Sequence, residues 1–215
     1  MGDIMKQARK IKASKKGSFR GFSPSRKCDE MVAWESLLEK DFIKVLDFDP
    51  SIEQIQSQPR KIEYRYKGKL HHYVPDFLAI TRDKHSILFE VKPEEKVNDE
   101  ENKVKFEVGK IYCKSKGWEF QVVNEADIRK GYLIQNLDLI RKVDERSTKQ
   151  STIMQIYDFI KENGKCKISD LRDNFSNIPR AEFDANLYYM IYNHYFEIDL
   201  INELLCEKTL IDIVR

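Results

Sequence analysis

The segments YVPDFLAIT, residues 73–81, and SILFEVK, residues 86–92, determine the fold of this chain. Both segments have the apolar character of β-strands, and residues 82–85 between them form a short polar turn. The run from Ile87 to Val91 is apolar except for Glu90, which is typical of a strand that is buried on both faces. The sequence therefore predicts two paired strands, covering residues 73–81 and 86–91, in the core of a sheet.

Each of these strands carries an acidic residue near the same end of the predicted pair. Asp76 lies early in the first strand, whereas Glu90 and Lys92 lie at the end of the second and point to one face. An unpaired carboxylate in an apolar setting is costly, so we expect the three side chains to meet. Two carboxylates can bind Mg²⁺ with retained waters, and a neighbouring lysine can orient or deprotonate an attacking water.

The spacing Pro-Asp, thirteen residues, Glu-x-Lys matches the pattern of the PD-(D/E)xK nucleases. The pattern alone is weak, because an acid in a turn and a surface ion pair produce the same letters.

A predicted helix before the strands offers a third acid. Apolar residues recur with helical spacing at Trp34, Leu37, Leu38, Phe42, Val45 and Leu46. Asp49-Pro50 ends this helix. Glu35 and Glu39 both border its apolar stripe, so either can reach the strand ends, and the other would be a surface acid.

The rest of the first domain, residues 28–146, has an α/β pattern. A polar stretch, residues 54–59, leads to a strand at 61–66 and a hairpin turn at Lys67-Gly68. A second helix ends near Gly117, a further strand follows at 118–123, and a third helix is expected over 126–143. Helices that alternate with buried strands indicate a layered α/β domain.

The C-terminal region, residues 147–215, has the pattern of three helices followed by a β-hairpin, which predicts a winged helix. The predicted third helix, which begins at Arg180, contains one arginine and two acidic residues. The helix and the residues just after it also contain four tyrosines, at positions 188, 189, 192 and 195. Such a surface suits a protein partner better than DNA phosphate. The alternative is that these tyrosines fill the domain's own core.

The charge of the chain is unevenly distributed. Residues 1–27 hold nine Lys or Arg and one acid, giving +8, so the remaining chain carries −6 within a net charge of +2. We expect this basic arm to contact DNA phosphate, with a solvated tail as the alternative. No membrane span or secretory signal is recognisable, and four scattered cysteines argue against zinc, so we expect a cytoplasmic protein.

Five separated motifs, in order and spacing, resemble the TnsA endonuclease family, the nuclease subunits of heteromeric Tn-seven-like transposons, some of them CRISPR-associated. They are VAWESLLEKDF at 32–42, LDFDP at 46–50, QP at 58–59, YVPDF at 73–77 and EVK at 90–92. The resemblance implies a restriction-endonuclease-like fold with a C-terminal winged helix.

The resemblance also implies site residues. In the family the helix glutamate follows a serine by three positions, as Glu39 follows Ser36, so Glu39 is preferred and Glu35 is held in reserve. The implied catalytic residues are Glu39, Asp76, Glu90 and Lys92. The implied ligands for Mg²⁺, or for Mn²⁺ as a substitute, are Glu39, Asp76, Glu90 and Val91.

The resemblance further implies hydrolysis of the 5′ strand at transposon ends, on double-stranded DNA. A TnsB-like DDE transposase would cut the other strand, and a TnsC-like AAA+ ATPase would bind the C-terminal domain. Two other readings remain: an autonomous restriction or phage-type PD-(D/E)xK endonuclease, and a DNA-binding scaffold without activity.

Other residues near the motifs have less defined roles. Gln58 belongs to a family motif, but its role stays undecided. His71 and His72 are expected to be surface residues. Three lysines on the second helix could contact phosphate or form a solvated face: Lys103, Lys105 and Lys110.

Overall fold

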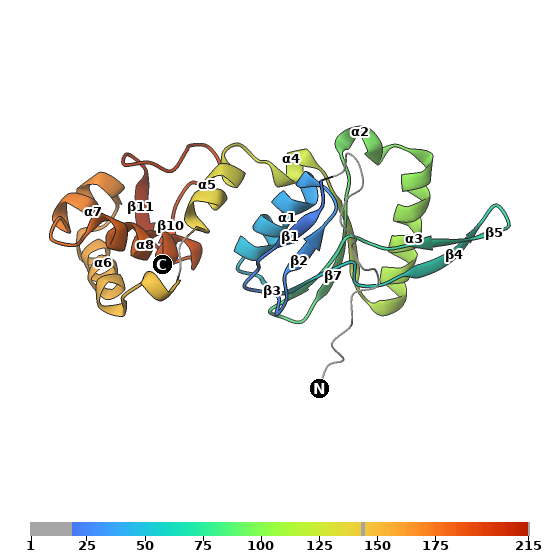
Figure 1. Ribbon diagram of the computed structural model, residues 1–215, viewed down its shortest axis with the longest axis horizontal. Coiled ribbons are helices and arrows are strands. Elements are labelled where there is room, and N and C mark those ends of the chain that lie inside the picture. The colour runs from blue at the N-terminus through green and yellow to red at the C-terminus, as the bar shows by residue number, and fades with distance from the viewer. Residues whose placement is uncertain (1–18, 143–144, 215) are drawn as a thin grey trace. The chain divides into compact units, whose positions relative to one another are not determined.

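The computed structural model describes residues 19–142 and 145–214 (Figure 1). The chain divides into two compact units, one up to Arg129 and the other from Lys130 onward. The first unit has a mixed α/β fold built on a multi-stranded sheet, in agreement with the predicted class. Within the described residues, no helix has the length and apolar character needed to cross a bilayer.

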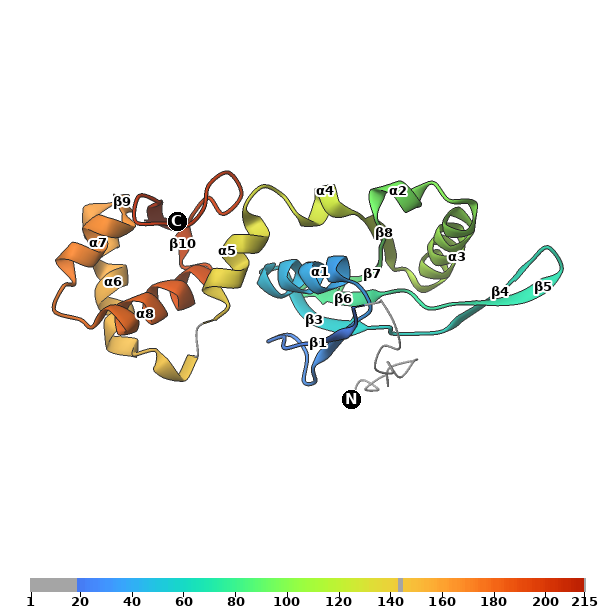
Figure 2. The same cartoon turned by 45° about the horizontal axis from the view of Figure 1, so that its top comes forward.

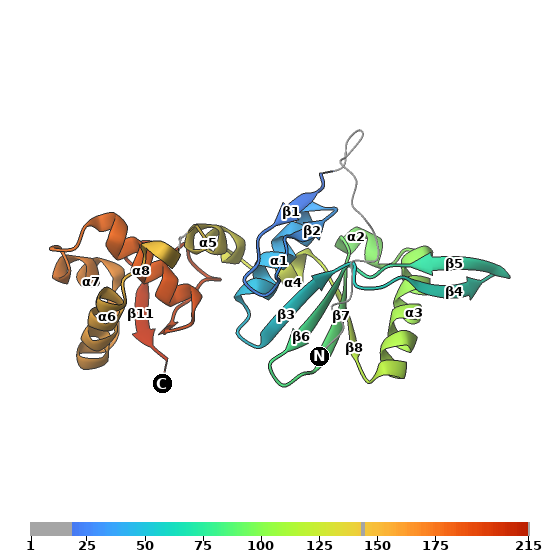
Figure 3. The same cartoon turned by 60° about the horizontal axis from the view of Figure 1, so that its bottom comes forward.

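A four-stranded sheet forms the centre of the first unit (Figures 2 and 3). In spatial order its strands are β3 (Ile52–Ser57), β6 (Phe77–Thr81), β7 (Ser86–Val91) and β8 (Glu119–Val123). The pairs β3–β6 and β6–β7 are antiparallel, whereas β7 and β8 are parallel. Parallel neighbours need a crossover, which α2 (Glu94–Val97) and α3 (Glu100–Lys116) supply.

Helices α1 (Leu37–Phe48) and α3 cover opposite faces of this sheet. Phe42 of α1 packs edge-on against Phe77 and Phe89, at centroid distances of 5.8 and 5.0 Å. The alternate residues Leu78 and Leu88 point to the other face and pack with Cys113 of α3. At Gly109, a Cβ atom would lie 2.4 Å from Phe120, so glycine is what lets α3 approach β8.

The predicted strand over 73–81 proves to be two strands. β4 (Ile62–Tyr66) and β5 (Lys69–Tyr73) form a separate hairpin, and β6 begins at Phe77. Pro75 breaks the run because it has no backbone N–H for a sheet ladder. The predicted turn at Lys67-Gly68 is confirmed, with φ values of 50° and 73°. β3 was not expected in a stretch that looks polar.

The start of the first helix was predicted too early, and order begins before residue 28. Trp34 belongs to β2 (Val32–Trp34), which pairs with β1 (Gly21–Ser23), and its Nε1 donates to Ser23 Oγ. Lys27 donates to the carbonyl oxygens of Leu46 and Asp49 at the end of α1. The last part of the predicted basic arm is therefore integral to the fold, whereas residues 1–18 lie outside the described residues.

The second unit combines helices with a small antiparallel sheet. Its helices are α5 (Leu133–Ile140), a 3-10 turn (Glu145–Ser147), α6 (Gln150–Asn163), α7 (Ile168–Asn174) and α8 (Arg180–Tyr192). Its sheet has the order β10 (Phe196–Glu197), β11 (Leu210–Ile213), β9 (Cys166–Lys167). The three helices from α6 onward and the β10–β11 pair after them follow the predicted order, with the short strand β9 added between α6 and α7, and the winged-helix assignment stays a prediction.

The predicted third helix, residues 126–143, is divided between α4 (Glu125–Ile128) and α5, and α5 belongs to the second unit. At Gly131, φ is +46°, and a Cβ atom would lie 2.1 Å from the carbonyl oxygen of Ile201. Tyr132 N–H donates to that same oxygen. The second unit therefore begins at residue 130, whereas the sequence predicted a boundary at 146. The contacts of Gly131 and Tyr132 with Ile201 attach the start of α5 to this unit.

Candidate active site

The structure brings Asp76, Glu90 and Lys92 together at one end of β6 and β7, as the hairpin argument predicted. Lys92 Nζ lies 2.6 Å from Glu90 Oε1 and 3.7 Å from Asp76 Oδ2. Asp76 Oδ2 also accepts a hydrogen bond from the Val91 N–H, at 2.8 Å. The strand register accounts for this proximity: Phe77 is paired with Phe89, so residue 76 lies opposite residue 90.

Tyr73 is a member of this cluster that the sequence argument missed. Its hydroxyl donates to Glu90 Oε2 at 2.7 Å, and Glu90 is only 2% exposed. Burial and the adjacent Glu90 raise the pKa of Tyr73, so the hydroxyl stays protonated and keeps donating. Tyr73 lies three residues before Asp76, but no sequence pattern indicates that its hydroxyl contacts Glu90.

Glu39 joins the cluster from α1 through a helix-capping motif. Ser36 is the N-cap residue, whose hydroxyl accepts from the Glu39 N–H at 3.1 Å and donates to Glu39 Oε1 at 2.9 Å. Glu39 Oε2 accepts from the Glu35 N–H, one residue before the N-cap, so both carboxylate oxygens are held by hydrogen bonds. The Ser-x-x-Glu spacing thus has a local cause, because it fixes the Glu39 carboxylate at the start of the helix.

The two helix glutamates differ in their surroundings. Burial, and after it the charge of Asp76, raises the pKa of Glu39 to about 7. Glu35 instead lies 3.6 Å from the guanidinium of Arg20. The geometry therefore favours Glu39 as the helix glutamate of the site, and its catalytic role stays a prediction.

The cluster carries more negative than positive charge. Burial raises the pKa of Asp76 to about 7, with the neighbouring Glu90 charge as the next cause. Burial alone would lower the pKa of Lys92, but Asp76, Glu90 and Glu39 outweigh it and raise that pKa. Lys92 is therefore an ammonium group, and one positive charge faces three carboxyl groups.

The oxygen atoms of this cluster are suitable ligands for Mg²⁺, although they do not form a complete, preformed metal site. Across residues 19–142 and 145–214, no three His, Cys, Asp or Glu side chains are grouped closely enough to share a metal ion. Mg²⁺ commonly takes only one or two protein carboxylates and keeps several waters. Asp76 and Glu90 provide two carboxylates, and the Val91 carbonyl, 3.2 Å from Lys92 Nζ, adds an oxygen beside them.

Gln58 supports the cluster through its backbone. Its N–H donates to the carbonyl of Asp76 at 2.8 Å, and its φ of +47° is unusual for a residue other than glycine. Its side-chain Oε1 is buried and accepts no hydrogen bond from any residue that the structure describes. The backbone bond gives Gln58 a structural role next to Asp76.

The remaining candidates lie outside the cluster. His71 stacks on Tyr64 and His72 lies 3.4 Å from Glu63, both on the β4–β5 hairpin, as expected for surface residues. On α3, Lys103 and Lys110 pair with the acids three positions before them. Their proposed phosphate contacts, and that of Lys105, stay predictions.

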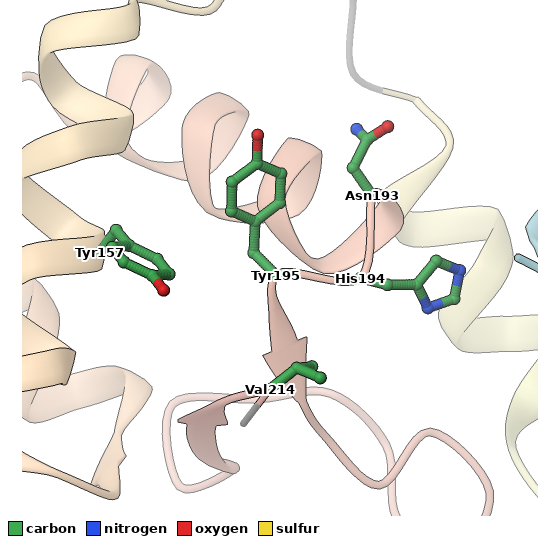
Figure 4. A pocket seen from close by; sticks show the side chains of 5 residues that line it. All are labelled: Tyr157, Asn193, His194, Tyr195 and Val214. Carbon is green, nitrogen blue, oxygen red and sulfur yellow. The ribbon is translucent and has the colours of Figure 1, made fainter.

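The second unit has an open pocket of about 340 Å³ without an acid–lysine cluster (Figure 4). It is lined by Tyr157, Asn193, His194, Tyr195 and Val214. Of the four tyrosines considered above, only Tyr192 is buried, and the other three are half-exposed. These tyrosines are therefore divided between the core of the second unit and its surface.

The raised pKa of Asp76 predicts how metal-free stability depends on pH. The folded protein keeps a proton that the unfolded chain releases above about pH 4, so the free energy of unfolding falls as pH rises to about 7. We expect Asp76→Asn to remove this loss. In a chelator, its melting temperature should exceed that of the wild type by on the order of 5 °C at pH 8 and by little at pH 4.5.

Thermal melting of both proteins at the two pH values, followed by circular dichroism, checks this prediction. Asp83→Asn is the matched control, since Asp83 lies in the exposed β6–β7 turn. A variant that is less stable than the wild type at pH 8 would contradict the burial argument.

Residues 49–125, which span β3 to the start of α4 and include Asp76, Glu90 and Lys92, match the family model described as TnsA-like endonuclease N terminal. No curated protein matches the chain. The matched segment supports a nuclease related to transposition, and it confirms the resemblance inferred from the sequence motifs.

Proposed function

The chain carries a TnsA-like endonuclease domain of the PD-(D/E)xK superfamily, and from this premise we propose that it cuts the 5′ strand of DNA at transposon ends. The observation that supports this most strongly is the meeting of Asp76, Glu90 and Lys92 inside the matched segment, with Glu39 of α1 beside them. A cluster of carboxyl groups with raised pKa values around one lysine is typical of a catalytic site and can serve phosphodiester hydrolysis.

The protein's own side chains have separate tasks in this proposal. The Lys92 ammonium attracts the scissile phosphate and holds a water near it by hydrogen bonding. The Val91 N–H fixes the Asp76 carboxylate, and Tyr73 fixes that of Glu90. Both carboxylates are thereby held in place before DNA arrives, which reduces the reorganisation needed for reaction.

Mg²⁺ is the proposed cofactor, with Mn²⁺ as a substitute, held by Asp76, Glu90 and the Val91 carbonyl. Glu39 would complete the set by moving closer on binding, since in the described residues the three carboxylates are not grouped as a metal site. When bound, it would supply Lewis-acid activation of the phosphate and of water. Binding would also neutralise the carboxylates that burial now penalises, so the cluster gains most from a cation at neutral pH.

The proposed partners are double-stranded DNA, a TnsB-like DDE transposase that cuts the other strand, and a TnsC-like AAA+ ATPase. We assign the ATPase to the second unit. Arg180, the only arginine of α8, is already paired with Asp184 and Glu207. Tyr157 and Tyr195 meet edge-on, at 6.4 Å, in the open pocket, and partly exposed tyrosines beside a pocket favour protein contact.

Strand-resolved cleavage of a plasmid that carries the transposon ends tests the proposed function. Wild-type protein and Asp76→Ala would be incubated with Mg²⁺, with and without the transposase of the same element. We expect a cut on the 5′ side that leaves a 5′-phosphate, needs the transposase and falls below detection in Asp76→Ala.

Other outcomes discriminate between the readings. A cut by the wild type alone would indicate an autonomous PD-(D/E)xK endonuclease. No cut under either condition, together with intact DNA binding, would favour a DNA-binding scaffold and reject the nuclease assignment.

A further inference from the structure

The β4–β5 hairpin projects from the first unit as a two-stranded ribbon. Its strands pair with each other and do not join the central sheet, and Figures 1 and 2 show it extending past α3. Only its base is buried, where Ile62 and Tyr73 pack into the apolar cluster with Leu88 and Cys113. Because only the base of the hairpin contacts the core, the rest of it buries little apolar surface. A contribution to the stability of the fold therefore does not explain its length.

Cross-strand contacts stiffen this ribbon. Tyr64 and His71 face each other and stack at 5.4 Å, and Tyr66 meets the His71 ring edge-on at 6.2 Å. Lys67 Nζ lies over the Tyr66 ring at 5.1 Å. Such pairs stabilise an isolated hairpin, so the ribbon is held as a defined arm.

The hairpin is strongly basic in an otherwise acidic body. Residues 60–72 contain five Lys or Arg and one acid, giving +4, whereas residues 28–215 as a whole carry −6. The single acid, Glu63, lies next to His72. Among the described residues, no ion pair engages Lys61, Arg65 or Lys69, so these cations are available to a polyanion.

The charges are distributed over both sides of the ribbon. Arg65 is paired with Leu70, and Lys61 lies four residues earlier, on the same face by strand alternation. This is the face opposite to Tyr64 and His71, and Leu70 on it is 57% exposed. Lys69 adds a cation near the tip.

The hairpin is joined directly to the candidate active site. β5 ends at Tyr73, which donates to Glu90, and Asp76 follows three residues later. Four residues of strand separate Tyr73 from Lys69, a span of about 14 Å. One DNA strand places a phosphate about every 3.4 Å of axis, so this span corresponds to about four phosphates.

We propose that the β4–β5 hairpin is a DNA-binding arm, whose Lys61, Arg65 and Lys69 contact the phosphate backbone of the duplex beside the scissile phosphate. A two-stranded ribbon has the width that the major groove admits. The proposal rests on the proposed function, because it needs DNA at the acid cluster. It assigns the hairpin a positioning task and no base recognition.

A charge-removal experiment on the full chain tests this arm. The double variant Lys61→Gln/Arg65→Gln would be compared with Arg82→Gln/Lys84→Gln, which removes one lysine and one arginine from the β6–β7 turn, at the ends of β6 and β7 away from the acid cluster. Binding to a fluorescent 30-base-pair duplex of random sequence would be measured by anisotropy, in a chelator, at several salt concentrations. Melting temperatures establish that both variants are folded.

We expect the hairpin variant to lose at least about 10-fold in affinity at low salt, with a salt slope smaller by about 2. The turn variant should stay within about twofold of the wild type. Equal binding by the two double variants would overturn the proposal and indicate a different partner for the hairpin, such as an acidic protein surface.

Cleavage by the wild type distinguishes this failure from a failure of the proposed function. If the wild type cuts transposon ends and the hairpin variant binds normally, only the arm is rejected. If the wild type never cuts but the hairpin variant loses affinity, the DNA contact stands and the nuclease assignment fails.

Discussion

Lys92→Met is expected to reduce strand cleavage by on the order of 10³-fold in Mg²⁺ while leaving DNA affinity within a few-fold. The methionine keeps most of the side-chain length but removes the only cation within a cluster of three carboxyl groups. Without that charge, the scissile phosphate meets an acidic site at which the described residues place no other cation. Single-turnover cleavage of a duplex with transposon ends, in the presence of the transposase, measures the effect.

Two further variants test whether the reduced cleavage of Lys92→Met is caused by the missing ammonium group. Lys92→Arg keeps the charge, but its planar guanidinium replaces a compact ammonium that fits 2.6 Å from Glu90 Oε1, so we expect only partial activity. Lys84→Met removes a lysine from the β6–β7 turn, where it pairs with Glu53, and should cleave normally. If Lys92→Met cuts within about 10-fold of the wild type, Lys92 is not catalytic.

Most of this cluster was predictable because its geometry is local. Asp76 and Glu90 belong to two strands joined by a short turn, so strand alternation and register fix their meeting. Glu39 is remote in sequence, but its Ser-x-x-Glu spacing is a capping motif that can be recognised without a structure.

Tyr73 and β3 were missed for a common reason. The partner of each lies in another segment, and the sequence around them does not reveal it. Tyr73 reaches Glu90 across the sheet, and β3 is an edge strand that pairs only with β6, so several of its polar side chains face solvent. A polar edge strand lacks the apolar alternation that identifies a half-buried strand.

The division between the units at residue 130 differs from the predicted boundary at 146, because helical periodicity shows that a helix has a buried face but not which segment covers that face. Leu137 and Ile140 of α5 are fully buried, as the pattern of the predicted third helix suggested. The segment that packs beside α5 is held by hydrogen bonds with Asn136, and its hydrogen-bond partners lie more than 60 residues later in the sequence. No local signal connects these segments.

Asn136→Ala is expected to destabilise the second unit by about 3–6 kcal/mol, enough to unfold it or nearly so. Asn136 is 1% exposed. Its Nδ2 donates to the carbonyls of Leu200 and Glu203, both at 2.9 Å, and its Oδ1 accepts from the Leu205 N–H at 2.8 Å. Alanine leaves these backbone groups without their partner, and each buried unsatisfied group costs about 1–3 kcal/mol.

Hydrogen exchange of the full chain checks this prediction. Amides of α8 around Leu187 and Met190, both fully buried, should lose protection in Asn136→Ala, whereas amides of α1 and α3 should keep theirs. Asn163→Ala is the matched control. Its amide also donates to a backbone carbonyl, that of Phe159, but at an exposed position, so its effect should stay below about 0.5 kcal/mol. If the two variants exchange alike, α5 is not what holds the loop at 200–205, and the boundary at residue 130 loses its physical basis.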